Sequence, residues 1–387
     1  MKKLFSVLLA LLLILSVVAC DQPEEPSSES SKWYSENGIT ITEEQVERIV
    51  NGEFTTPKNI IVIIGDGMGP NDLILAEQYA KGVYDFGLVL NKIKNHGLAT
   101  THSASHEVTD SAASGTALAT GVKTNNETIG KDPEGNDLKN LAEYAREAGK
   151  KIGIITDEDI SGATPSAFVV HNVSRDNRNE LASAMIKFRP DVLMCVDHDS
   201  TMFSLDAEGR RIFDSEYLVA KDFKRFNSVL ETDPNCEKPF WGFLNGYSTA
   251  TSDNLAQCAE VALKRLQNEN GFFLMIESAG TDKFGHRNDM AGKLNSVVTL
   301  DRTVAAVLKF MEENPDTLLI VTSDHETGNV QLPVTGEESL SDLLTITEHS
   351  ATPVRVFGVG KGTEYFSGKT VDNTDIAKFL IEAIKGE

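Results

Sequence analysis

The stretch NIIVIIGDGMG, residues 59–69, combines an uninterrupted apolar run with a sudden change to glycine and aspartate. The run predicts a strand that is buried on both faces, because a half-exposed strand would alternate apolar and polar side chains. Asp66 follows this strand directly, between Gly65 and Gly67. A carboxylate at that point can accept backbone hydrogen bonds, cap a helix or bind a metal ion, and the stretch alone leaves these roles open.

Apolar runs of the same kind recur along the chain and predict five further buried strands, at 151–156, 191–196, 271–277, 317–324 and 353–360. Helical patterns lie between them, near 71–80, 138–149, 175–188, 253–268, 290–313 and 373–385. This alternation predicts an α/β fold with a central, mostly parallel β-sheet sandwiched between helices. The region near 197–250 is rich in acidic, aromatic, glycine and proline residues, so we expect a loop-rich insertion on the substrate side.

The N-terminal segment differs in composition from the rest of the chain. Residues 1–19 have two lysines followed by an apolar run, which predicts a cleaved secretory signal. The ending Val-Val-Ala-Cys resembles a bacterial lipobox and implies a lipid on the Cys20 thiol; a buried apolar helix is the alternative. Residues 20–37 are rich in Pro, Ser and Glu and predict a flexible tether. We therefore expect the folded domain at 38–387, in an extracytoplasmic protein that is lipid-anchored at the cell membrane or in the periplasm.

The chain is strongly acidic, with 58 Asp and Glu residues against 36 Lys and Arg residues and a formal net charge of −22. This surplus argues against a nucleic-acid partner, whose phosphates would be repelled. It also suits an anionic substrate poorly, unless bound cations reverse the local field. Apart from Cys20, only Cys195, Cys236 and Cys258 are present, which is too few for a disulfide scaffold, although the chain could form one pair.

The segment IESAGTDKFGH, residues 276–286, carries residue types that bind metal ions. Asp282 and His286 are four residues apart, so a helix would place both on one face, where they could chelate one ion. Glu277 ends the preceding strand, and a hard carboxylate at that point suits magnesium better than zinc. A surface Asp–His pair without a metal is the alternative for this segment.

The segment VTSDHETGN, residues 321–329, places Asp324 and His325 side by side after a buried strand. In a continuing strand their side chains would face opposite ways, so both reach one site only if the strand ends there. The following Glu-Thr-Gly-Asn supports such an ending, and the pair is a candidate for metal binding. His349, before the last predicted strand, is a ligand candidate too, although a histidine in a loop is the more ordinary interpretation when it is considered alone.

The stretch EVTDSAASGTALATG, residues 107–121, predicts a helix that begins at Ser111 and consists almost only of small residues. Its N-terminus favours an incoming anion, because free N–H groups and the helix dipole point there. A serine hydroxyl is a weak nucleophile and needs a base or a metal ion beside it. The supply of Asp and His residues fits metal activation of Ser111 better than a Ser-His-Asp triad. A simple N-cap at Asp110 or Ser111 is the alternative.

The segment GATPSAFVVHNVSR, residues 162–175, contributes Thr164 and Arg175. The planar guanidinium group of arginine suits a phosphate or a carboxylate better than the lysine ammonium does. Arg175 is therefore a candidate for binding an anion, and a surface arginine that opens the helix at 175–188 is the alternative.

Taken together and in this order, the motifs resemble those of the alkaline phosphatase family: IGDGMG, VTDSAASGTALATGVKT, ATPSAFVVHNVSR, MIESAGTDKFGH, VTSDHETGN and HSATPVRVFGVG. They extend over residues 60–360, and the full set is more specific than any one piece. The resemblance implies an alkaline-phosphatase-like fold and the hydrolysis of phosphate monoesters to inorganic phosphate and an alcohol.

The resemblance also implies two zinc ions and one magnesium ion per chain. One zinc would be bound by Asp282, His286 and His349. The second zinc, beside the Ser111 oxygen, would be bound by Asp66, Asp324 and His325. The magnesium ion would be bound by Asp66, Thr164 and Glu277. Arg175 would bind two phosphate oxygens, and Ser111 would form a phosphoseryl intermediate.

Two other activities stay open. A phosphodiesterase or phosphonate-ester hydrolase of the same superfamily would share the two-metal cradle, but Arg175 favours a monoester because it matches a phosphoryl group with several free oxygens. A non-enzymatic surface lipoprotein that captures phosphate would keep the metals and Arg175 without needing Ser111. A homodimer is compatible with the sequence.

The chain departs from the family pattern at three places. Gly162 stands where relatives carry Asp or His next to the magnesium site, which puts the identity of the third ion in question. Thr327 stands where some relatives carry His, and the stretch after Asp191 lacks the usual Gly-rich loop. Lys283 and Tyr247 are further side chains that could reach the substrate.

Overall fold

The computed structural model describes residues 32–33, 41–84, 86–196, 224–226, 232–244, 254–333 and 338–386. Several expectations concern residues outside these ranges and stay predictions: the signal at 1–19, Cys20, Tyr247, and most of the tether and of the insertion. Among the described helices, none combines the length and the apolar character that crossing a membrane requires.

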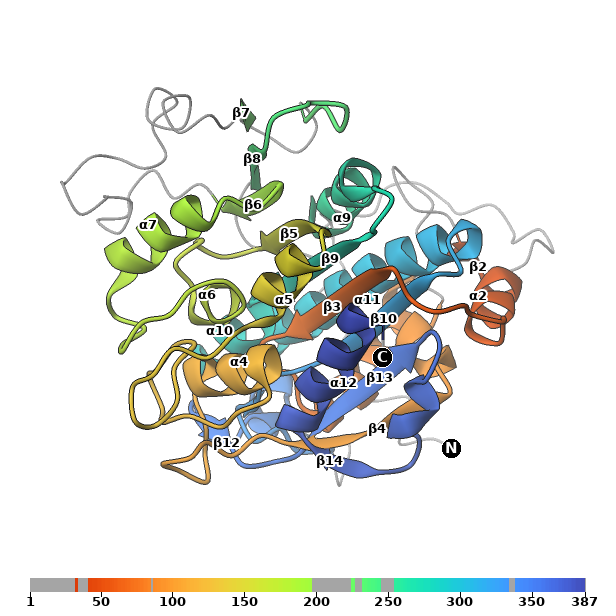
Figure 1. The fold of residues 1–387 in the computed structure, drawn as a ribbon. Helices are drawn as coiled ribbons and strands as arrows, with labels where there is room; N and C mark the ends of the chain where they lie inside the picture. The colour runs from red at the N-terminus through yellow and green to blue at the C-terminus, as the bar shows by residue number, and fades with distance from the viewer. Residues whose placement is uncertain are drawn as a thin grey trace.

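Among the described residues, ten strands form one central sheet in the order β14-β4-β13-β10-β3-β9-β5-β6-β8-β7 (Figure 1). Their bounds are β3 (Asn59–Gly65), β4 (Asn95–Thr100), β5 (Lys151–Thr156), β6 (Val192–Val196), β7 (Lys224–Phe226), β8 (Phe240–Leu244), β9 (Phe272–Ser278), β10 (Thr317–Thr322), β13 (Val354–Val359) and β14 (Thr370–Asp372). Only β13 runs antiparallel to its neighbours, β10 and β4. The expected mostly parallel sheet is thereby confirmed.

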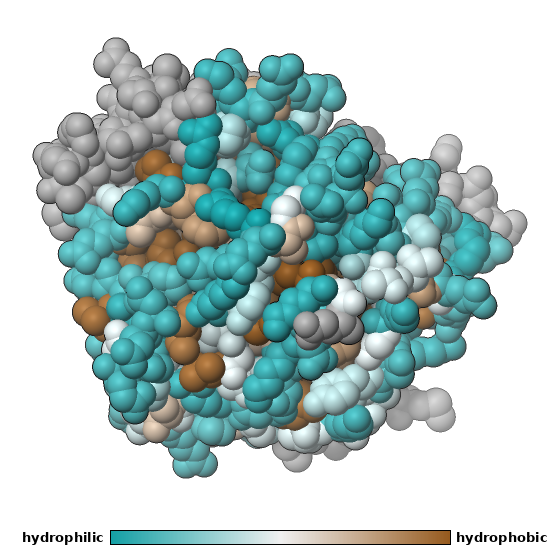
Figure 2. All heavy atoms as spheres, viewed as in Figure 1, coloured by the Kyte–Doolittle hydropathy of each residue, from teal (hydrophilic) through white to brown (hydrophobic). Residues whose placement is uncertain are grey.

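Helices cover both faces of the sheet (Figure 1). One face packs against α2 (Glu43–Val50), α3 (Pro70–Tyr84), α9 (Asn254–Leu266) and α11 (Met290–Glu313). The other face packs against α4 (Ser111–Thr120), α5 (Leu141–Glu147), α6 (Ala163–Ala167), α7 (Arg178–Phe188) and α12 (Asn373–Lys385). The short helix α10 (Gly280–His286) follows β9 and packs against α11. The face seen in Figure 2 is mostly hydrophilic, with small and scattered hydrophobic patches.

The position of β3 in the sheet explains why the stretch at residues 59–65 is apolar throughout. It lies between β10 and β9, and its side chains alternate between two separate apolar cores. Ile61 and Ile63 belong to the core on the α11 side, whereas Ile60, Val62 and Ile64 belong to the core on the α4 side. Because both faces are covered, no polar position remains, and each fully buried isoleucine contributes roughly 1.5–3 kcal/mol relative to exposure.

All six predicted strands are present in the central sheet, and four of its ten described strands were not predicted. β4 has the sequence NHGLAT and β14 has TVD, and neither contains a continuous apolar run. The described parts of the region near 197–250 contribute β7 and β8, which extend the sheet at one edge. The stretch FWGFL of β8 is apolar, but its position inside a loop-rich composition concealed it.

The small residues of α4 allow the helix to pack closely on all sides. All ten of its residues are buried, between α6 and α12. The Ser114 Oγ donates a hydrogen bond of 2.6 Å to the Asp324 carbonyl oxygen and accepts one of 2.9 Å from the Asn373 side chain. A Cβ atom on Gly115 would lie 3.2 Å from the Ala167 Cβ. Longer side chains would therefore push α4 away from the end of β10.

Replacing Gly115 with valine should destabilise the protein. The Cβ already makes a tight contact with Ala167, so the added methyl groups overpack the helix interface, which costs about 1–3 kcal/mol. The measurement is the free energy of unfolding in urea, followed by circular dichroism. Gly82→Val in α3 is the matched control, because nothing lies within 4 Å of a Cβ there. Equal stability of the two variants would contradict the proposed packing constraint.

Candidate active site

The site residues gather where the parallel strands β3, β9 and β10 end. Asp66 follows β3, Glu277 lies at the end of β9, and Asp324 follows β10. This is the sheet edge at which open α/β folds place their ligands. The turn after Asp66 needs a glycine, since Gly67 has φ +71° and a Cβ there would lie 2.8 Å from the Asp282 Cα. Gly67 thus brings the Asp66 loop against α10.

The first group of candidate ligands is Asp282, His286 and His349. As predicted, Asp282 and His286 lie on one face of a helix, with the His286 Nε2 3.2 Å from the Asp282 Oδ1. The His349 Nε2 lies 3.4 Å from the same oxygen and 3.2 Å from the His286 Nε2. Backbone carbonyl oxygens orient both rings, because the Nδ1 atoms of His286 and His349 contact Thr347 and Thr109.

The second group is Asp66, Asp324 and His325, and all three residues are buried. The strand β10 ends at Thr322, so Asp324 and His325 reach one site, as the sequence required. The His325 Nε2 lies 3.3 Å from the Asp324 Oδ2 and 3.4 Å from the Asp66 Oδ1. The same nitrogen lies 3.1 Å from the Ser111 Oγ. Three oxygen atoms therefore surround a single ring nitrogen.

The electrostatics of the second group favour a cation. Burial, together with the charges of Asp324 and Asp282, raises the pKa of Asp66 well above its usual range. Burial and the neighbouring Asp282 raise the pKa of Asp324 to about 6. Burial lowers the pKa of His325, so its ring is neutral, as a metal ligand must be. Among the described residues, the Asp66 Oδ1 and the Asp324 Oδ2 have no hydrogen-bond partner.

Thr327 connects the two groups. Its Oγ1 donates a hydrogen bond of 2.6 Å to the Asp282 Oδ1 and lies 3.3 Å from the His325 Nδ1. The rings of His325 and His349 also stack, with centroids 3.6 Å apart. In the sequence, Thr327 stands out only as a departure from the family pattern, whereas in the structure it contacts both groups.

Ser111 is the first residue of α4, and Asp110 is the N-cap. The Asp110 Oδ1 accepts a hydrogen bond of 3.0 Å from the Ala113 N–H. The Asp110 Oδ2 accepts one of 3.1 Å from the Arg175 Nη1. Arg175 does not open a helix, since α7 begins at Arg178. Asp110 instead holds the guanidinium group beside Ser111 and the helix N-terminus.

The two other predicted magnesium ligands, Thr164 and Glu277, are fully buried. The Thr164 Oγ1 and the Glu277 Oε1 have no hydrogen-bond partner among the described residues, and the Glu277 Oε2 accepts a hydrogen bond from Thr156. Burial and the charge of Glu158 raise the pKa of Glu277 well above its usual range. Within the described part of the chain, Glu277 belongs to neither close group of ligand atoms.

Two carboxylates that the sequence analysis did not single out follow the strand β5. The Asp157 Oδ1 accepts a hydrogen bond of 2.6 Å from the Ala279 N–H, and burial raises the pKa of Asp157 to about 7. The Glu158 Oε2 lies 3.3 Å from the Lys283 Nζ. Lys283, a candidate for reaching the substrate, thus contacts Glu158. The position directly after a buried strand, which singled out Asp66, would also have singled out Asp157 but not Glu158.

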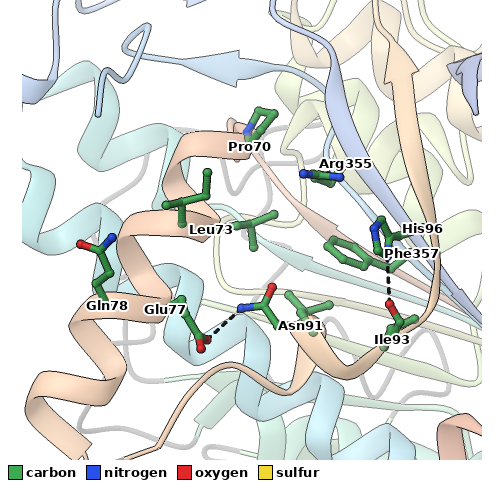
Figure 3. Close-up of a pocket in the computed structure, with 11 residues that line it drawn as sticks. Pro70, Leu73, Glu77, Gln78, Asn91, Ile93, His96, Arg355 and Phe357 are labelled. Atoms are coloured by element: carbon green, nitrogen blue, oxygen red, sulfur yellow. Dashed lines mark hydrogen bonds between the residues drawn. The ribbon is translucent and has the colours of Figure 1, made fainter. Parts of the chain in front are cut away.

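A separate hollow of about 260 Å³ lies between α3, β4 and β13 (Figure 3). His96 and Arg355 face it from the strands, and Glu77 faces it from α3. The Glu77 carboxylate already accepts hydrogen bonds from the Asn91 side chain and the Leu88 N–H. None of the predicted site residues lines this hollow, so it is not part of the candidate active site.

The structure thus belongs to the class of α/β-fold proteins with a candidate metal site. A serine at a helix N-terminus lies beside two close groups of carboxylate and histidine side chains. The chain belongs to the alkaline phosphatase family, whose sequence model matches residues 57–201 and 246–343. The resemblance seen in the motifs is thereby confirmed.

Several characterised relatives carry phosphatase names. Alkaline phosphatase 4 of Bacillus subtilis is 31% identical over 73% of this chain, and the match spans 64% of that relative, less than two thirds of its length. The alkaline phosphatase of Escherichia coli is 28% identical over 78% of this chain and 77% of its own length. The streptomycin-6-phosphate phosphatase of Streptomyces griseus is 26% identical over 82% of this chain and 83% of its own.

Solved structures agree in fold. The alkaline phosphatase from the Antarctic bacterium TAB5 superimposes with a TM-score of 0.75 at 27% identity, covering 86% of this chain and 99% of that one. A mutant of that enzyme, with a TM-score of 0.73, identity of 27% and the same coverage, has magnesium bound in its M3 site.

Zinc should stabilise the chelator-treated protein. An ion that binds only the native state at 100 times its dissociation constant adds about 2.7 kcal/mol to the free energy of unfolding. The thermal midpoint, measured by differential scanning fluorimetry, should therefore rise on zinc addition, and Asp324→Asn should reduce that rise. His96→Ala is the control, because the His96 ring packs against Phe357 and lines the separate hollow. An unchanged rise in Asp324→Asn would refute its role as a ligand.

Proposed function

We propose that the chain hydrolyses phosphate monoesters, with Ser111 as the nucleophile and metal ions at the two ligand groups. The observation that carries this proposal is the convergence of the Ser111 Oγ, the Asp66 Oδ1 and the Asp324 Oδ2 on the His325 Nε2. In a Ser-His-Asp triad, serine and carboxylate contact opposite ring nitrogens. Here all three oxygens share one nitrogen, and a common cation accounts for that arrangement.

The donor sets fit the ions that the family implies. The unpartnered, buried oxygens of Asp66 and Asp324 would otherwise cost free energy, which supports a cation between them. Histidine with carboxylate suits zinc, and oxygen-only donors suit magnesium. We assign the ligands as Asp282, His286 and His349 for one zinc, Asp66, Asp324 and His325 for the other, and Asp66, Thr164 and Glu277 for magnesium. Ions held by these residues would lower the pKa of the serine hydroxyl and stabilise the leaving oxygen.

The residues around Ser111 suit a phosphoryl group with several free oxygens. Arg175 is fixed by Asp110 beside the N-terminus of α4, and a guanidinium fork can bind two phosphoryl oxygens at once. The helix dipole of α4 adds to this attraction. A diester has one free oxygen fewer and would leave part of this arrangement unused, so the site favours monoesters.

The reaction then has two displacement steps. The Ser111 oxygen forms a bond to phosphorus while the bond from phosphorus to the alcohol oxygen breaks, and the alcohol leaves with a proton. Water hydrolyses the resulting phosphoserine, which releases inorganic phosphate and restores Ser111. Arg175 holds the phosphoryl oxygens through both steps, and Asp110 keeps Arg175 in position.

The wild-type protein should hydrolyse p-nitrophenyl phosphate faster than bis-p-nitrophenyl phosphate. Ser111→Ala should lower the monoesterase rate by roughly 10³-fold or more, because the nucleophile is lost. The rise of its thermal midpoint on zinc addition should remain. That result would show that the variant is folded and has lost only the catalytic step. Faster turnover of the diester would favour the diesterase alternative, and phosphate binding without turnover in the wild type would favour a capture protein. Near-normal rates in Ser111→Ala would refute the assignment of Ser111 as the nucleophile.

We also propose that the protein works outside the cytoplasm, anchored by a lipid on Cys20. The support is the sequence of residues 1–20, with two lysines, an apolar run and the ending Val-Val-Ala-Cys. Expressed in a bacterium, Cys20→Ser should abolish incorporation of labelled fatty acid and move the protein from the membrane fraction to the soluble fraction. Equal labelling of the variant and the wild type would refute this anchor.

A further inference from the structure

Gly162 leaves a space that the Glu158 carboxylate fills. A Cβ atom built on Gly162 would lie 1.9 Å from the Glu158 Oε1, far inside van der Waals contact. The backbone at Gly162 has φ −52° and ψ 150°, which any residue can adopt. The absence of a side chain at position 162 is therefore explained by the Glu158 carboxylate and not by the backbone conformation.

Glu158 is held firmly in this position. It is 7% exposed, and it lies two residues beyond the end of the strand β5. Its N–H donates a hydrogen bond of 3.0 Å to the Thr156 Oγ1, and its carbonyl oxygen accepts one of 3.0 Å from the Val196 N–H. Thr156 in turn donates to the Glu277 carboxylate, so Glu158 and the predicted magnesium ligand Glu277 are connected through one hydroxyl group.

The Glu158 carboxylate already binds a cation, the ammonium group of Lys283. The Lys283 Nζ lies 3.3 Å from the Glu158 Oε2 and 3.6 Å from the Asp282 Oδ2. Lys283 therefore contacts the Glu158 and Asp282 carboxylates with the same ammonium group.

Two of the predicted magnesium ligands have an oxygen atom that the protein does not satisfy. The Thr164 Oγ1 and the Glu277 Oε1 are buried and have no hydrogen-bond partner among the described residues. Such oxygens normally have a partner, and their number here calls for a ligand. Carboxylate and hydroxyl oxygens are the ligands that magnesium prefers.

We propose that Glu158 replaces the side chain that is absent at position 162 and supplies the outer carboxylate of the third cation site, beside Asp66, Thr164 and Glu277. Glu158 binds the magnesium ion directly or through its water shell, and Lys283 is the counter-ion of Glu158. The proposal rests on the magnesium site of the proposed function, but it does not depend on the role of Ser111.

The test is a magnesium titration of the zinc-loaded protein by isothermal calorimetry, with metal content measured by elemental analysis. Glu158→Gln should weaken magnesium affinity by about 10–100-fold, as the loss of a partner around a metal does, and should leave the zinc content unchanged. Gly162→Ala should weaken it too, because its Cβ displaces the Glu158 carboxylate. The double variant Glu158→Ala with Gly162→Asp should recover affinity, since a carboxylate returns to the same space. Glu147→Gln, at an exposed position, is the control.

Unchanged magnesium affinity in Glu158→Gln would overturn the proposal. Loss of affinity in Glu158→Gln with full affinity in Gly162→Ala would overturn the replacement of the position-162 side chain. A wild-type protein that hydrolyses monoesters but binds no magnesium would overturn the third site and leave the proposed function intact. Unchanged zinc content and circular dichroism separate all of these outcomes from misfolding.

Discussion

Asp66, Asp282 and Asp324 bring three carboxylates together in a place that water barely reaches, since each residue is at most 3% exposed. An uncompensated buried charge is costly, so the protein must supply donors or cations around them. It supplies the Thr327 hydroxyl to Asp282, and the Gly67 and His325 N–H groups to Asp324. These donors leave the Asp66 Oδ1 and the Asp324 Oδ2 without a hydrogen bond among the described residues. The proposed cation would compensate both oxygen atoms.

The surrounding structure keeps these carboxylates close together in spite of their repulsion. Lys293 of α11 holds the loop after Asp66 in place. Its fully buried ammonium group donates to the Gly67 carbonyl oxygen at 2.9 Å and to the Asp72 carboxylate. Asp72 also accepts a hydrogen bond of 2.8 Å from the Gly69 N–H. On the opposite face of the sheet, the small side chains of α4 let Ser114 bind the Asp324 carbonyl oxygen directly. Buried contacts on both faces of the sheet therefore fix the positions of Asp66 and Asp324.

The strands that are buried on both faces could be predicted from the sequence. Residues whose role depends on contacts with distant parts of the chain could not. β3 and β10 are apolar on both faces, so their ends, and with them Asp66 and Asp324, could be located without a structure. β4 carries polar residues because it lies near one end of the sheet, and its pattern gave no signal. Glu158 belongs to the acidic run TDED, which resembles an ordinary surface turn. Its contact with Lys283 and its fit against Gly162 exist only in the folded chain.

A net charge of −22 and an anionic substrate are compatible because charge acts locally. At physiological ionic strength exposed charges are screened over about 8 Å, so acidic groups on distant surfaces scarcely affect a phosphate at Ser111. Within that range lie Arg175, held by Asp110, and the N-terminus of α4, whose dipole is favourable for an anion. In the proposed function, the acidic ligands would not repel the phosphate once cations bind between them. The same carboxylates would then help to create a site that attracts an anion.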